Sequence, residues 1–200
     1  MSEEQSYINT VHQALDYVND MFNDKLNMIV ATVFSCIHLD KRVILCATYN
    51  NIPLCDNFAQ ELNNLFIQKT GKISVYSLNS DGRNLALLKK GDPANIFSAQ
   101  FDMVSHEGDL LMLVPGEYPA PGNQDPSEPA LVNLIERAHA NKSTIINLSA
   151  SSRDTFITDR LACDSINLNF SAVSNQDASA IVLMFILQYI IRTVRYEISS

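Results

Sequence analysis

The stretch at residues 109–148 decides the fold of this chain. It contains an apolar run, DLLMLVP (109–115), then a helical pattern, ALVNLIERAHANK (130–142), and a second apolar run, TIINL (144–148). Two buried strands joined by one amphipathic helix form a βαβ unit, because parallel strands need a crossover long enough to pack on the sheet. We therefore predict parallel strands and expect ligands to bind in the loops at their carboxyl ends.

The same patterns continue on both sides of this unit. Strands are expected at residues 42–47, 73–78, 109–114, 144–148 and 165–168. Helices are expected from Asn51 to Gly71, at 79–88, 92–104 and 175–196, and in a short piece within 149–164. This order predicts an α/β fold with a five-stranded, mainly parallel sheet and helices on both faces.

The first 40 residues are predicted to form a pair of helices, at 3–19 and about 25–38, separated by the polar residues Asn23 and Asp24. The first helix has one apolar face, and the second is apolar on more than one side. We expect such a wide apolar surface to be buried partly against another subunit. The chain is thus predicted to be one domain, 1–200, with a helical pair at 1–40 and an α/β core at 41–200.

The composition excludes several classes of function. The chain has 200 residues, 46% hydrophobic, and a net charge of −8 with no Lys/Arg cluster. Binding to a phosphate backbone depends on releasing counterions through basic residues, so direct nucleic-acid binding is not expected. The longest apolar segment, 178–191, is too short to span a bilayer, and the acidic amino terminus is unlike a secretion signal. We expect a cytoplasmic protein that does not enter the membrane.

The chain has four cysteines, and no two of them form a C-x-x-C pair: Cys36, Cys46, Cys55 and Cys163. Three of them lie within apolar stretches, where a reduced thiol serves as a small core residue. No metal site and no cofactor are predicted.

Four segments of the chain resemble the sugar isomerase (SIS) domain. They are RVILC followed by NFAQEL, NIFSAQFDMVSHEGDLLML, IERAHANKSTIINLSA, and the terminal QDASAIVLMFILQYII. Within this family the chain is most similar to the single-domain bacterial group of phosphoheptose isomerases and DnaA-initiator-associating proteins. The resemblance implies a flavodoxin-like fold and a homotetramer with helices at the subunit interfaces.

The phosphate-binding motifs of the family are absent. Its glycine-rich turn, G-N-G-G-S, corresponds here to Ala-Thr-Tyr-Asn-Asn at 47–51, and its serine-rich loop corresponds to a proline-rich segment at 115–129. Asn51, Ser127 and Ser149 remain as candidates for substrate binding. Ser127 has an alternative role as a helix cap ahead of Pro129.

The resemblance also locates the family's two catalytic groups. Its carboxylate matches Glu61, but its histidine matches Ser179, which cannot accept a proton near neutral pH without a base of its own. Glu61 is therefore either a vestige of catalysis or an interface carboxylate that pairs with Arg or Lys of another subunit. The four histidines, His12, His38, His106 and His139, do not fall at the carboxyl end of any predicted strand, so none replaces the missing base.

These patterns favour a non-catalytic SIS-fold adaptor that binds the replication initiator DnaA. Exposed residues near the end of the last helix, Arg192, Arg195 and Tyr196, are the candidate contact surface. The first alternative is a divergent phosphoheptose isomerase, which converts sedoheptulose 7-phosphate to a heptose 7-phosphate. A third possibility is a sensor that binds a phosphosugar without converting it.

Overall fold

The computed structural model describes residues 3–78, 92–116, 127–149, 165–169 and 176–199. Its five strands form one sheet in the order β2-β1-β3-β4-β5, and every pair of neighbours is parallel. This is the strand order of the flavodoxin-like folds. The predicted α/β fold and its five-stranded parallel sheet are therefore confirmed.

The strands lie within one or two residues of their predicted positions. They are β1 (Val43–Ala47), β2 (Val75–Ser77), β3 (Leu110–Val114), β4 (Thr144–Ser149) and β5 (Ile166–Asn169). The second strand is shorter than predicted. The side chain of Ile73 is 64% exposed, and Oδ1 of Asn63 accepts hydrogen bonds from the backbone N–H groups of Ser74 and Val75.

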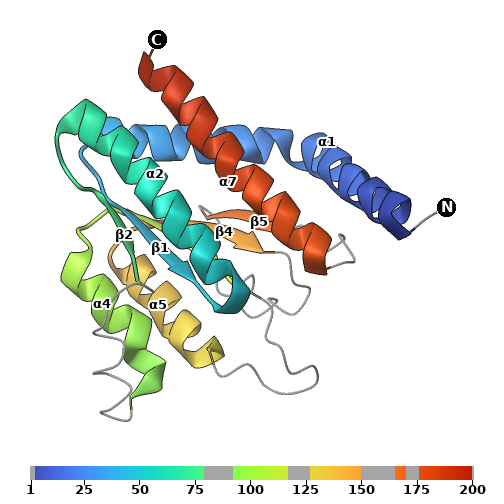
Figure 1. Ribbon diagram of the computed structural model, residues 1–200. Coiled ribbons are helices and arrows are strands. Elements are labelled where there is room, and N and C mark those ends of the chain that lie inside the picture. Colours follow the sequence, from blue (N-terminus) through green and yellow to red (C-terminus); the bar gives the residue numbers. More distant parts are fainter. Residues whose placement is uncertain (1–2, 79–91, 117–126, 150–164, 170–175, 200) are drawn as a thin grey trace.

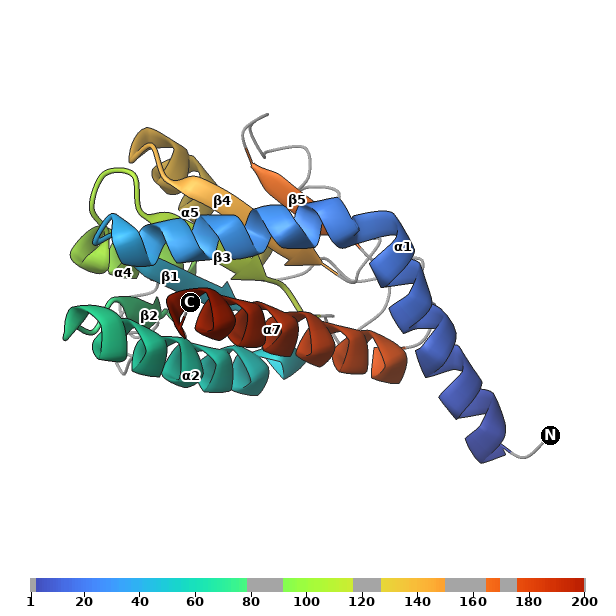
Figure 2. The ribbon, with the colours of Figure 1, turned by 90° about the horizontal axis from the view of Figure 1, so that it is seen from above.

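Two layers of helices cover the sheet (Figures 1 and 2). One layer consists of α1 (Glu3–His38), α2 (Ile52–Thr70) and α7 (Gln176–Ser199), with α7 between the other two. The other consists of α4 (Ile96–Val104) and α5 (Glu128–Ala140); two short 3-10 helices, η1 (Tyr49–Asn51) and η2 (Pro93–Asn95), precede α2 and α4. Successive strand residues alternate between the two cores: Val43 and Leu45 pack toward α1, α2 and α7, whereas Ile44 and Cys46 pack toward α4 and α5.

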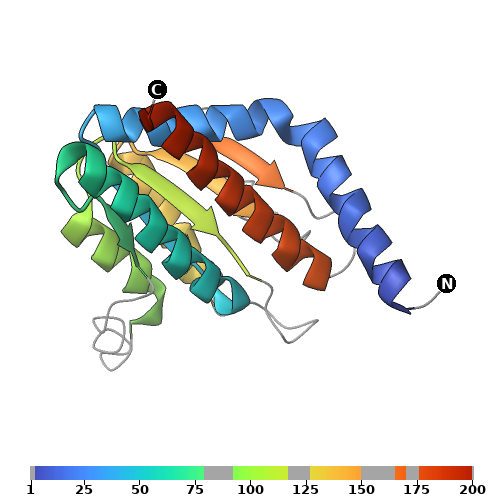
Figure 3. The same ribbon diagram turned by 45° about the horizontal axis from the view of Figure 1, so that its top comes forward.

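The predicted pair of amino-terminal helices is wrong, because α1 is a single helix of 36 residues. It bends part way along, and its amino-terminal part extends past the start of α7 (Figures 2 and 3). Asn and Asp inside a helix each cost only about 0.5 kcal/mol. Val18 and Leu26, on either side of Asn23 and Asp24, are both buried in the core that α1 shares with α7, and this packing outweighs the polar break.

The terminal helix is longer than the apolar run in the sequence. Among the described residues, the segment Ser179–Ser199 is long and apolar enough to cross a membrane by length and composition. However, Val182, Ile186, Ile190 and Val194 of this helix are buried in the core of the domain. A core helix of a soluble protein gives the same signal. The helices predicted at 79–88 and within 149–164 lie outside the described residues.

Candidate functional site

In this strand order, ligands bind in the crevice at the carboxyl ends of β1 and β3. The chain leaves β1 toward β2 and leaves β3 toward β4, so the two connections diverge and open a crevice between them. Residues 48–51 follow β1, and residues 115–116 follow β3. These two segments form the walls of the candidate site.

Hydrogen bonds join the two walls directly. The backbone N–H of Gly116 donates to Oγ1 of Thr48 at 2.9 Å, and Nδ2 of Asn51 donates to the carbonyl oxygen of Pro115 at 2.9 Å. Thr48 and Asn51 are both buried. The backbone N–H of Gly116 and the side-chain amide of Asn51 are therefore already paired with other groups of the protein.

The backbones of the two walls are also in close contact. A Cβ atom placed on Gly116 would lie 2.3 Å from the carbonyl oxygen of Thr48 and 2.5 Å from Oδ1 of Asn50. Tyr49 adopts a left-handed backbone conformation with φ of 52°, at a position where the isomerase motif has glycine. Such a conformation costs a residue with a side chain about 1 kcal/mol. The segment thus keeps a turn that suits glycine but carries a large side chain.

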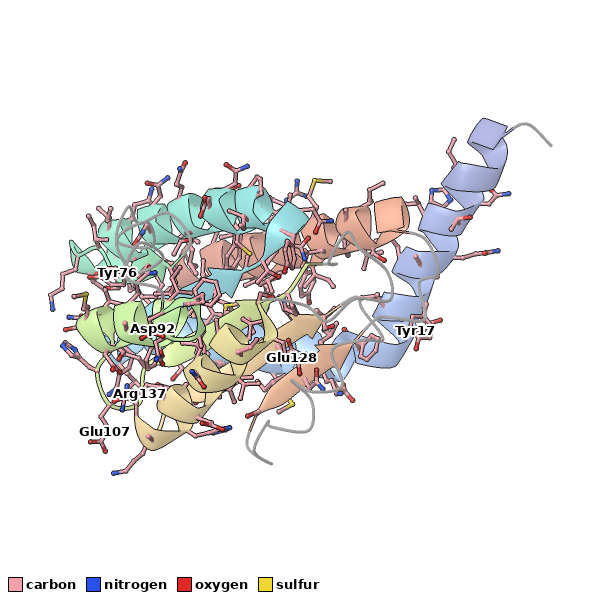
Figure 4. All side chains as sticks on the ribbon, turned by 90° about the horizontal axis from the view of Figure 1, so that it is seen from below. Tyr17, Tyr76, Asp92, Glu107, Glu128 and Arg137 are labelled. Carbon is pink, nitrogen blue, oxygen red and sulfur yellow. The ribbon has the colours of Figure 1, made fainter. Side chains whose placement is uncertain are left out.

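The described residues at the mouth of this crevice carry negative charge and no positive charge. The described segments at its mouth, 48–56, 115–116 and 127–129, contain the carboxylates Asp56 and Glu128 and no Lys or Arg. Asp56 accepts a hydrogen bond from the hydroxyl of Ser77 at 2.7 Å. Glu128 lies at the start of α5, whereas Arg137 lies near the other end of this helix, on the side of Glu107 (Figure 4).

The three candidates for substrate binding lie at this edge of the sheet but do not form one site. Asn51 holds the two walls together, as described above. Ser127 is at the N-cap position of α5, where its side chain makes no capping hydrogen bond. Ser149 ends β4 and is fully buried; the register places it level with Pro115. Their role in binding a substrate stays a prediction.

Glu61 lies away from the crevice, in a groove between α2 and α7. The groove has a volume of about 480 Å³ and is lined by Phe58, Met184 and Leu187 together with several amide side chains. Glu61 is half-buried, and its Oε1 accepts a hydrogen bond from Nε2 of Gln188 at 2.9 Å.

Ser179 does not reach Glu61 within one chain. It precedes Gln188 by nine residues in α7, which corresponds to about 13 Å along the helix axis. The two positions that match the family's catalytic pair are therefore well separated along the direction of α7 in this subunit.

The four histidines, all among the described residues, lie away from the crevice. No group of three or more His, Cys, Asp or Glu side chains in the described part of the chain has a geometry suited to a metal ion. His106 precedes β3 and His139 is near the end of α5, both at the amino edge of the sheet, and His12 and His38 lie on α1. Cys36, Cys46 and Cys55 are buried free thiols, and Cys163 is outside the described residues.

The sequence patterns did not identify Thr48 and Gly116, the residues that close the crevice. Gly116 directly after a buried strand was the available signal, since a glycine there permits a close approach of two backbones. The partner of that approach lies 68 residues away in the chain. Only the arrangement of the strands brings the two together.

The chain was compared with known proteins at the level of sequence and of structure. No family model and no curated protein sequence matches it. A phosphoheptose isomerase from Francisella tularensis is similar in structure, with a TM-score of 0.73, 16% sequence identity, and coverage of 96% of this chain and 100% of the other. The phosphoheptose isomerase GmhA from Neisseria gonorrhoeae has a TM-score of 0.77 and 14% identity, and 96% of each chain is covered.

The chain therefore has the fold of the phosphoheptose isomerases, which are SIS-fold proteins. The predicted SIS fold is confirmed over almost the whole chain. At 14% and 16% identity, the similarity establishes the architecture and not the activity.

Proposed function

We propose that this chain is a non-catalytic SIS-fold adaptor. The observation that carries the proposal is the closed crevice, where Gly116 and Pro115 bond directly to Thr48 and Asn51. The replacement of the family's histidine by Ser179 supports the same conclusion. An enzyme of this fold needs an open anion site and a pair of proton carriers, and the described residues supply neither.

The proposed partner is the replication initiator DnaA, in the cytoplasm. A homo-oligomer, which we expect to be a tetramer, would present several identical surfaces and so raise the effective concentration of bound initiator molecules near one another. Three exposed residues lie near the end of α7: Arg192, Arg195 and Tyr196. Tyr196 is 72% exposed. An exposed aromatic residue beside arginines is a composition that is common in binding hot spots.

Surface plasmon resonance with the immobilised amino-terminal domain of DnaA tests this proposal. The wild-type chain should bind, and the combined substitution Arg192→Ala, Arg195→Ala and Tyr196→Ala should weaken binding by about tenfold or more. A matched control removes Arg137 and Lys142, which are exposed at the far end of α5 and its following turn, and should leave binding unchanged. No binding by the wild-type chain would rule out this partner.

The isomerase is the second candidate, and the structural similarity to two phosphoheptose isomerases favours it. Incubation with sedoheptulose 7-phosphate, followed by chromatography of the heptose phosphates, decides between the two. Turnover that Glu61→Gln abolishes would replace the adaptor by the enzyme. A phosphosugar sensor predicts no turnover but a rise in melting temperature, because a ligand that binds the folded state stabilises it.

A further inference from the structure

A second cavity lies at the amino edge of the sheet, at the opposite ends of the strands from the crevice. It has a volume of about 340 Å³ and is open to solvent. The last turns of α1 contribute Thr32, Ser35 and Cys36 to its walls, and the starts of β3 and β4 contribute Leu110 and Thr144. A cavity of this volume is large enough for a small organic molecule.

Lys41 is the one charged residue among the described residues that line this cavity. It is half-buried, and its Nζ donates a hydrogen bond to the carbonyl oxygen of Glu107 at 2.8 Å. The ammonium group lies close over the turn before β3, because a Cβ placed on Gly108 would be 3.4 Å from Nζ. A carbonyl oxygen does not neutralise a positive charge, so a half-buried ammonium group is stabilised further by an anion beside it.

The carboxylates near Lys41 have other partners. The carboxylate of Glu107 pairs with Nζ of Lys142 at 2.7 Å. The carboxylate of Asp109 is buried and accepts hydrogen bonds from two backbone N–H groups. Within the described part of the chain, no carboxylate lies at ion-pair distance from Lys41. The positive charge in the cavity is therefore available to a ligand.

The other walls of the cavity are uncharged. The side-chain hydroxyls of Ser35 and Thr144 form no hydrogen bond with a described residue, so both can donate to a ligand. Leu39 and Leu110 supply apolar surface, and Leu39 is 65% exposed. Burial raises the pKa of the Cys36 thiol from 9.0 to about 12, so this thiol adds no negative charge near neutral pH. The cavity thus combines one cation, two hydroxyl groups and an apolar wall.

We infer that this cavity binds a small monocarboxylate with a short apolar chain. One carboxylate oxygen accepts from the ammonium group of Lys41, the other accepts from the hydroxyl of Ser35 or Thr144, and the apolar chain lies against Leu39. A single cation matches a monoanion better than the doubly charged phosphate of a sugar phosphate, whose hydroxyl groups would also face an apolar wall. The cavity is separate from the crevice and from the surface proposed to bind the initiator, so it would be present in an adaptor and in an isomerase alike.

Isothermal titration calorimetry of the full chain with isocaproate tests this site. The wild-type chain should bind with a dissociation constant below about 1 mM. Lys41→Met should weaken binding by about tenfold or more, because a charge-assisted hydrogen bond is lost. Isocaproamide, which has the same chain without the charge, should bind more weakly by a similar factor. Lys72→Met is the matched control and should leave binding unchanged, since Lys72 lies at the same edge of the sheet but pairs with Asp40 at 2.5 Å.

Ser35→Leu tests the cavity independently of the charge. Ser35 is exposed on α1, so leucine should be tolerated there, and its larger side chain should fill the cavity and weaken binding by about tenfold or more. Circular dichroism checks that each variant is folded, and Ser35→Leu decides the question if Lys41→Met does not fold.

Three results would overturn the inference. The first is the absence of saturable binding of isocaproate by the wild-type chain. The second is binding that the folded Lys41→Met and Ser35→Leu variants retain in full, because the ligand would then lie elsewhere on the molecule. The third is binding of inorganic phosphate that depends on Lys41 while isocaproate does not bind, because the class of ligand would then be wrong.

Discussion

Gly116 is the residue on which the closed crevice depends most. Its φ is not in the left-handed region, so the requirement for glycine comes from space alone: a Cβ would lie 2.3 Å from the carbonyl oxygen of Thr48. An added methyl group must therefore push the two loops apart. The two hydrogen bonds that join the walls would lengthen or break with it.

We predict that Gly116→Ala lowers the free energy of unfolding by about 3 kcal/mol, as overpacking in a dense interior does. Gly71→Ala is the matched control, because Gly71 has a φ of 74° and nothing within 4 Å of its added Cβ. That change should cost about 1 kcal/mol through backbone strain alone. Urea unfolding of both variants measures the difference. Equal losses would show that the loops are not in contact.

The buried cysteines give the stability of the chain a dependence on pH. Burial raises the pKa of Cys36 and of Cys55 from 9.0 to about 12, and it raises the pKa of Cys46 as well. In the unfolded chain these thiols ionise near pH 9. A raised pKa in the folded state contributes stability below pH 9, and this contribution is lost as the pH rises through the folded value.

We therefore predict that the free energy of unfolding falls between pH 9 and about 12, and that Cys55→Ala makes this fall less steep. Urea unfolding at several pH values measures the slope. The three described thiols should also resist a thiol reagent in the folded protein and react after denaturation. Rapid reaction of all of them in the native state would contradict their burial.

At the scale of single residues, the sequence predicted what the site has lost more reliably than what replaced it. The sequence itself shows that residues 47–51 contain no glycine and that Ser179 stands where the family has a histidine. The bond between Thr48 and Gly116 is not, because it depends on the register of β1 against β3. For the same reason, the sequence indicated Asn51 only as a candidate for substrate binding and did not show that its side chain bonds to Pro115.

At the scale of elements, Asp109 connects two chain segments at the amino edge of the sheet. Its carboxylate is buried and accepts hydrogen bonds from the backbone N–H of Arg42 at 2.9 Å and of His106 at 2.6 Å. These bonds join the start of β1 to the turn before β3. The turn is thereby fixed relative to the central strands.

We predict that Asp109→Ala lowers the free energy of unfolding by about 3 kcal/mol, because two N–H groups lose a charged acceptor. Asp102→Ala is the control, since Asp102 forms an exposed ion pair with Arg137 and should cost less than about 1 kcal/mol. Thermal unfolding followed by circular dichroism compares the two. A loss at Asp109 no larger than the loss at Asp102 would contradict this account.

The elements themselves were largely predictable, for a physical reason. β1 and β3 are buried on both faces, so each appears in the sequence as an unbroken apolar run. α2 has Pro53 at its start and Gly71 in a left-handed conformation at its end, which are strong local signals. The break predicted at Asn23 and Asp24 failed because local propensity is weak compared with the burial of Val18 and Leu26.

At the scale of the whole molecule, an architecture similar to that of two phosphoheptose isomerases is combined with a crevice whose described walls are hydrogen-bonded to each other. The sheet order and the two helical layers keep the fold of the two isomerases at low sequence identity. The same strand ends that could hold a phosphosugar are instead bonded to each other. Large apolar side chains remain exposed on the α1/α7/α2 layer, among them Met184 and Phe185.

Isothermal titration calorimetry with sedoheptulose 7-phosphate tests the closed crevice most directly. The two bonded walls and the carboxylates beside them predict no saturable binding up to a concentration of about 1 mM, which corresponds to a binding free energy weaker than about −4 kcal/mol. Saturable binding with a dissociation constant in the micromolar range, lost in a variant altered at Thr48 or Asn51, would contradict the account.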